Sequence, residues 1–204
     1  MSYSIILPPF TLKFRNMSAG ELKGYRAWFL DSIPARAIVL QNVVRADPDF
    51  ATWKPDHSRA SFDNLASWLC GQVETRPRTA EEIDEIKRRS AYDFGVPPNE
   101  LTNRTFSLAM DVGMYFGETL RTQYPHLEWD QPLKSKISAD FGQMVLLGFG
   151  RVALNPVHIA VTFCYGIASG RRTATRFDEI YAYWSRLADK ARDTTAAQAL
   201  GKSS

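Results

Sequence analysis

Apolar residues recur at helical spacing along most of the chain, which predicts a mainly helical protein. The first helix is expected to begin at Ser18, because Ser18 and Glu21 form a capping box that satisfies two backbone amides. Pro34 predicts that this helix ends and a second one starts, since proline is tolerated in a first helical turn. We therefore expect a tight helical hairpin, with two buried faces: Leu22, Tyr25, Trp28 and Phe29 in the first helix, and Ile33, Ala37, Leu40 and Val44 in the second.

Two more helices are predicted before the centre of the chain. Residues 47–59 are rich in proline and polar residues and are expected to form a loop. The amphipathic helix that follows buries Phe62, Leu65, Trp68, Leu69 and Val73. Thr79 and Glu82 form a second capping box, and the helix it starts is expected to end before Pro97.

The segment from about 102 to 124 is apolar around most of its circumference and is predicted to be the buried core helix. Its small residues Ala109, Gly113 and Gly117 lie four apart, so another backbone can approach closely there. Polar residues form a stripe along its other side: Arg104, Ser107, Asp111 and Glu118.

After Pro125 the pattern changes, and 126–130 and 143–149 are predicted to pair as antiparallel strands. Asn155 and Pro156 predict a helix start, Gly170 predicts its end, and a last helix begins near Thr175. The expected fold class is α+β and predominantly α, with a small antiparallel β-hairpin or sheet. We expect one domain over residues 1–193 and a flexible tail over 194–204.

Composition supports a folded domain and narrows its environment. The 204 residues are 45% hydrophobic and 12% aromatic, which is enough to fill a core. No apolar run reaches the roughly 20 residues that span a bilayer, and the N-terminus lacks the basic start of a secretory signal. We therefore expect a cytoplasmic protein in which Cys70 and Cys164 are buried thiols. A net charge of +3 permits binding to nucleic acid but does not indicate it.

Asp111 and Glu118 are the candidate catalytic residues. They lie seven positions apart on the core helix, about 20° from one another around it, so both could face one cleft as an acid and base pair. The alternative is an ion-paired stripe in which Arg104 and Arg121 neutralise them.

Other chemistry is represented only by short clusters. His126, Glu128 and Asp130 share a strand face but lack a metal-ligand spacing, and an exposed polar face explains them better. The glycines of 148–150 lack the remaining features of a phosphate loop and indicate a strand end. No metal or cofactor is expected. A basic turn could hold a phosphate or an acidic partner through Arg171, Arg172 and Arg176.

Two stretches resemble a loose group of small uncharacterised bacterial proteins. They are 21–40, with Trp28-Phe29 and Ile33-Pro34, and 111–156, with its Gly113 and Gly117 helix, Trp129, Gly148-Phe149 and Asn155-Pro156. Some members of that group are of the kind encoded beside polymorphic toxins as cytoplasmic immunity proteins. The resemblance implies a binding protein that captures one cognate protein toxin.

Three hypotheses of function therefore remain. Tight stoichiometric capture of a toxin is the first, and a small hydrolase-type enzyme using Asp111 and Glu118 is the alternative. The third is a nucleic-acid-associated protein using the basic turn at 171–176. An enzyme is less expected than a binding protein, because the sequence shows no complete catalytic motif.

Overall fold

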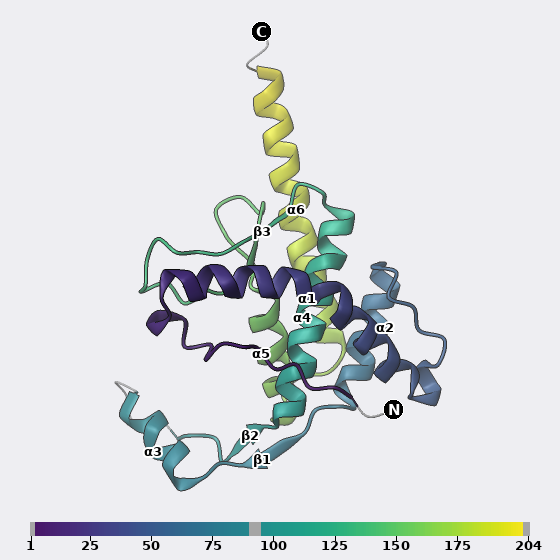
Figure 1. Cartoon of the computed structure of the whole chain (residues 1–204). Helices are drawn as coiled ribbons and strands as arrows, with labels where there is room; N and C mark the ends of the chain where they lie inside the picture. The colour runs from purple at the N-terminus through teal and green to yellow at the C-terminus, as the bar shows by residue number, and fades with distance from the viewer. Residues whose placement is uncertain (1–2, 90–94, 202–204) are drawn as a thin grey trace.

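A computed structural model describes residues 3–89 and 95–201, and it has an α+β fold that is mainly α (Figure 1). The helices it describes are α1 (Ala19–Arg45), α2 (Arg59–Cys70), α3 (Ala80–Arg89), α4 (Asn103–Gln123), α5 (Pro156–Ala168) and α6 (Thr175–Gly201). The strands are β1 (Thr75–Pro77), β2 (Asn99–Leu101), β3 (Glu128–Asp130) and β4 (Val145–Leu147). Short 3₁₀ turns lie at Phe14–Asn16 and Pro48–Phe50.

α1 is one continuous helix, so the predicted helical hairpin is wrong. The capping box at its start is confirmed, since the Glu21 carboxylate accepts from the Ser18 amide at 2.8 Å and Ser18 Oγ accepts from the Glu21 amide. Pro34 lies inside the helix on its exposed side, and the Ser32 hydroxyl donates to the Trp28 carbonyl at 2.6 Å nearby. Residues on one face stay buried before and after the proline: Leu22, Tyr25, Phe29, Arg36, Leu40 and Val44. Burial of that continuous face outweighs the cost of an interior proline.

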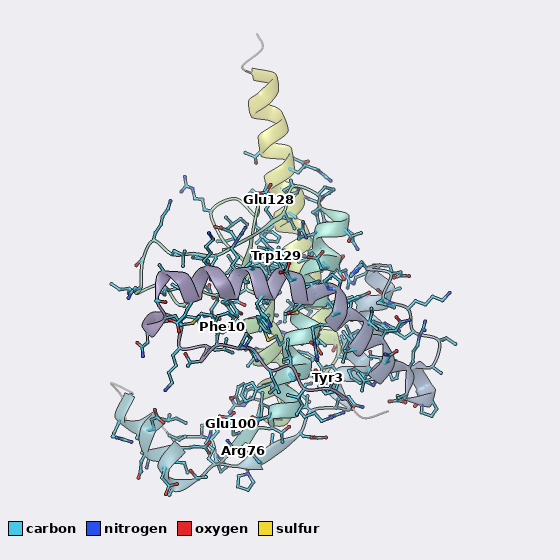
Figure 2. The ribbon with its side chains drawn as sticks, in the orientation of Figure 1. Tyr3, Phe10, Arg76, Glu100, Glu128 and Trp129 are labelled. Atoms are coloured by element: carbon cyan, nitrogen blue, oxygen red, sulfur yellow. The ribbon has the colours of Figure 1, made fainter. Side chains whose placement is uncertain are left out.

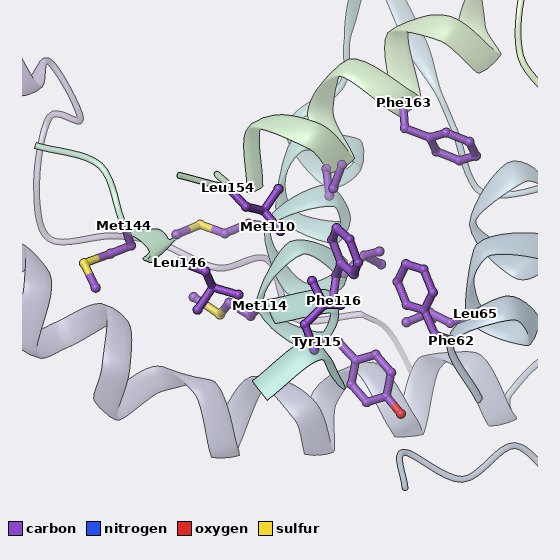
Figure 3. Packing of buried hydrophobic residues seen from close by; sticks show 14 of the residues in the cluster. Phe62, Leu65, Met110, Met114, Tyr115, Phe116, Met144, Leu146, Leu154 and Phe163 are labelled. Carbon is purple, nitrogen blue, oxygen red and sulfur yellow. The ribbon is translucent and has the colours of Figure 1, made fainter. Parts of the chain in front are cut away.

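α4 is the central helix of the core, as predicted, and it packs against α1, α2 and α5. Figure 3 shows Met110, Met114, Tyr115 and Phe116 of α4 beside side chains of α2, the β3–β4 region and α5. The predicted close approach of another backbone is confirmed at Gly113, whereas Gly117 meets a side chain. A β-carbon on Gly113 would lie 2.6 Å from Val157 Cα of α5, and one on Gly117 would lie 2.3 Å from the Trp129 ring.

Two small antiparallel sheets accompany the helices. The predicted pair is β3 with β4, in the register Glu128↔Leu147, and an additional bridge joins Leu146 to Leu154. The second sheet, β1 with β2, is not evident from the sequence because each strand has only three residues and β1 contains Pro77. Glu100 of β2 stabilises that sheet by accepting from Arg78 and from the Tyr165 hydroxyl of α5.

α3 and α6 extend away from the central helices. α3 lies beyond the β1–β2 hairpin, and the C-terminal half of α6 projects past the rest of the molecule (Figure 1). The α5 cap is confirmed, with Asn155 Oδ1 accepting from the His158 amide at 2.9 Å. α6 remains helical to Gly201, so the backbone of 194–201 is helical where a tail was expected. Flexibility of that segment, like the single-domain boundary at 193, stays a prediction.

Candidate partner-binding site

Asp111 is buried in a charged cluster that joins three segments of the chain. Its Oδ1 and Oδ2 accept from Arg36 Nε and Nη2 of α1, each at 2.7 Å. The hydroxyl of Tyr3, from the N-terminal segment, donates to Oδ2 at 2.5 Å and also contacts Ser107. Burial, the strongest influence on this carboxyl, raises the pKa of Asp111, whereas Arg36 and Tyr3 act in the opposite direction. The structure thus pairs Asp111 with Arg36 and not with Arg104.

Glu118 has a different set of partners. Its carboxylate accepts from Trp129 Nε1 at 2.6 Å and from Arg121 Nη1 at 2.9 and 3.1 Å. The expected Arg121 pair is therefore confirmed, whereas Arg104 binds Glu74 and Gln72 instead. Neither Asp111 nor Glu118 lines any of four prominent cavities in the part of the chain that the structure describes. Each predicted catalytic carboxylate is held by its own arginine, and the two share none of these four cavities.

The three arginines of the basic turn after α5 have different surroundings. Arg171 is exposed, but the Arg172 side chain lies over Gly166, with its Cδ 2.2 Å from where a β-carbon of Gly166 would stand. Arg176 forms an ion pair with Glu179 of α6. Arg172 and Arg176 are therefore directed to different neighbours, whereas Arg171 is exposed.

The remaining sequence candidates are the metal-ligating side chains and the two cysteines. Among the described residues no three His, Cys, Asp or Glu side chains come together as a metal site. Cys70 and Cys164 are free thiols, and burial raises the pKa of both, that of Cys164 to about 12. None of the helices in 3–89 and 95–201 is long and apolar enough to cross a membrane.

The largest of the four cavities has a volume of about 810 Å³ and lies between α6 and the loop that follows β4. We call it the α6 cavity. Its lining residues are His126, Gly148, Phe149, Gly150, Arg151, Val152, Tyr183, Leu187, Lys190, Ala191 and Thr194. Most of the exposed lining is apolar, and no carboxylate contributes to it. The site therefore combines an apolar surface with cationic side chains.

Two glycines shape the loop side of the α6 cavity. Gly148 and Gly150 have φ values of 111° and 84°, which side chains rarely allow. A β-carbon on Gly148 would also lie 2.9 Å from the His126 carbonyl oxygen. The turn brings Phe149 edge-on to Trp184 of α6, with ring centroids 4.9 Å apart. The glycines of 148–150 are thus a wall of the cavity as well as the predicted strand end.

No protein-family model, curated protein or solved structure matches this chain. The site therefore has to be assessed from its own geometry.

A second cavity, about 500 Å³ in volume, is more apolar. It lies where the N-terminal segment crosses α4 and α5, and it is lined by Ile5, Ile6, Leu7, Pro8, Leu12, Asn103, Phe106, Ser107, Met110, Val157 and Val161. Figure 2 marks Tyr3, which begins this segment, and Phe10 further along it. The lining of this cavity includes no charged side chain, so its surface offers no electrostatic indication of a partner.

The sequence reading missed the α6 cavity. Tyr183, Leu187, Lys190, Ala191 and Thr194 occupy positions i, i+4, i+7, i+8 and i+11 of one helix face, a spacing visible in the sequence. The opposing loop, with Phe149 and Arg151, could not be placed beside that face without the tertiary structure.

Proposed function

We propose that this chain is a cytoplasmic immunity protein that neutralises one cognate bacterial toxin by tight, stoichiometric capture. The proposal is motivated by the resemblance of 21–40 and 111–156 to a loose group of small uncharacterised bacterial proteins, some of the kind encoded beside polymorphic toxins. The observation that carries it is the α6 cavity, whose exposed aromatic and aliphatic side chains lie next to cations. Tyrosine and arginine are enriched where proteins bind one another.

The surroundings of the two α4 carboxylates, Asp111 and Glu118, favour a binding protein over a hydrolase that uses this helix. A general acid or base must reach a substrate proton, but the Asp111 side chain is 0% exposed and is bound by Arg36. Glu118 is bound by Arg121 and Trp129. Both carboxylates therefore contribute to the architecture, and no observation favours the hydrolase alternative. In the basic turn, Arg172 lies over Gly166 and Arg176 pairs with Glu179, so no observation favours the nucleic-acid hypothesis.

Co-expression tests the proposal. The toxin to test would be the variable C-terminal domain of any large secreted protein that a neighbouring reading frame encodes. Cells that produce it should survive only when the chain is also produced, and the two should co-purify in a fixed ratio. Capture that outlasts toxin turnover needs a nanomolar or lower Kd, which corresponds to a binding free energy of about −12 kcal/mol.

Two outcomes would contradict the proposal. Protection by the chain at levels far below those of the toxin would indicate an enzyme that removes the toxin's product. If the chain makes no difference to cell survival with any adjacent gene product, the immunity proposal is excluded. An unrelated toxin produced at the same level serves as the control, and it should kill the cells whether or not the chain is present.

A further inference from the structure

The α6 cavity carries an inference about the chemistry of its partner, which rests on the proposed function. The apolar lining of this cavity includes one buried aromatic ring and two exposed side chains. Phe149 is 4% exposed and is fixed against Trp184, whereas Val152 and Tyr183 are 48% and 50% exposed. Leu187 of α6 also lines the cavity and is half-buried. An apolar side chain inserted here would cover Val152 and Tyr183 without displacing the fixed ring.

Cations accompany this apolar surface. Arg151 follows the glycine turn, and Lys190 lies one turn beyond Leu187 on α6. Neither has an ion-pair partner within the part of the chain that the structure describes. Asp189 and Asp193 of α6 both pair with Arg192, and neither carboxylate lines the cavity. The surface therefore presents net positive charge beside exposed apolar groups.

The shape of the surface favours an elongated occupant. The cavity follows one face of α6 from Tyr183 to Thr194, and Figure 1 shows that α6 continues beyond the body of the molecule. A segment lying along α6 can place an apolar side chain between Phe149 and Leu187. The same segment can place carboxylates against Arg151 and Lys190.

We propose that the α6 cavity binds an acidic amphipathic segment of the captured protein. Apolar side chains of that segment contact Val152, Tyr183 and Leu187, and its Asp or Glu side chains pair with Arg151 and Lys190. The opposite charges speed association and select the partner, and the apolar contacts hold it.

A peptide probe tests this chemistry without the toxin. The full chain is titrated with a rhodamine-labelled amphipathic peptide that carries Leu and Phe on one face and Glu beside them. The matched probe has Gln in place of every Glu. Fluorescence anisotropy should show the Glu peptide binding at least about tenfold more tightly than the Gln peptide at low salt, with the difference shrinking as salt screens the charges.

Charge reversal locates the site. The double variant Arg151→Glu/Lys190→Glu should lose at least about tenfold in affinity for the Glu peptide. The control Lys23→Glu/Arg26→Glu makes the same change in net charge at exposed positions of α1 and should bind like the wild type. Tyr183→Ala should weaken both peptides, since its half-exposed ring contributes apolar contact. Circular dichroism checks that each variant is folded.

The two proposals fail in different ways. If the toxin binds the wild type and the Arg151→Glu/Lys190→Glu variant equally well, the α6 cavity is not the docking site, but the immunity proposal is unaffected. If the peptides behave as expected but no adjacent toxin is captured, the immunity proposal is wrong, but the acidic-segment site is unaffected. Equal affinities for the Glu and Gln peptides, or no binding of either, would overturn the acidic-segment proposal.

Discussion

At the scale of single residues, His57 shows how a loop position is set by its neighbours. Its φ of 57° is left-handed, its ring stacks on Tyr115 with centroids 4.7 Å apart, and its amide donates to the Tyr115 hydroxyl at 3.0 Å. Its Nδ1 is buried and has no hydrogen-bond partner in 3–89 or 95–201. Burial lowers the pKa of His57 below its ordinary value of 6.5, although Asp56 and Glu118 act in the opposite direction.

This pKa predicts a loss of stability in mild acid. A histidine with a lowered pKa in the folded state binds protons more readily in the unfolded chain, so its stabilising contribution is present above pH 6.5 and is lost as the pH falls below it. His57→Asn keeps a residue that tolerates positive φ but cannot titrate. Urea unfolding at about pH 7.5 and about pH 5.5 should therefore show a smaller loss for this variant than for the wild type.

His158 provides the control for that measurement. His158→Gln removes a histidine from an exposed position of α5 and controls for the loss of an imidazole as such. An unchanged pH dependence in His57→Asn would mean that His57 does not titrate differently in the folded protein.

At the scale of elements, the crossing of α4 and α5 depends on Gly113. Ala would normally stabilise a helix interior relative to Gly by about 0.5–1 kcal/mol. Here the added carbon would meet backbone atoms, 2.6 Å from Val157 Cα and 2.8 Å from Val157 N. Because α5 must shift to make room, Gly113→Ala should lower the free energy of unfolding by about 1–3 kcal/mol.

Gly20→Ala is the matched substitution in α1. Nothing lies within 4 Å of a β-carbon at Gly20, so this change should raise the free energy of unfolding by about 0.5–1 kcal/mol. Chemical denaturation of both variants compares Gly20, which has open space around it, with Gly113, which is in close contact with α5. Equal effects at the two positions would show that α4 and α5 are not in close backbone contact.

At the scale of the whole molecule, Arg36 and Asp111 join elements that are 75 residues apart, and Tyr3 adds the N-terminal segment. Asp111→Ala would leave the Arg36 guanidinium buried without its carboxylate. Breaking a buried pair in this way costs about 3–5 kcal/mol. Thermal and urea unfolding should both show that loss.

An exposed pair on α6 is the control for Asp111. The side chains of Arg176 and Glu179 are 53% and 62% exposed, so Glu179→Ala should change the free energy of unfolding by at most about 1 kcal/mol. A loss for Asp111→Ala as small as that would show that water reaches the Arg36 cluster.

The sequence by itself determined the features that depend on neighbouring residues. Both capping boxes, the buried α4, the β3–β4 pair and the Asn155 cap follow from local spacing and from backbone amides that need partners. The Glu118–Arg121 pair was also predictable, because residues three apart meet on a helix surface.

Only the tertiary structure decided which distant segments meet. Helix capping rules treat Pro34 as a start signal, yet the buried face of α1 continues on both sides of it, with Phe29 before the proline and Leu40 after it. Asp111 has Arg36 as its partner, and not Arg104, because α1 crosses α4 at that position. The α6 cavity exists because a glycine turn after β4 meets one face of α6, and no local pattern encodes that encounter.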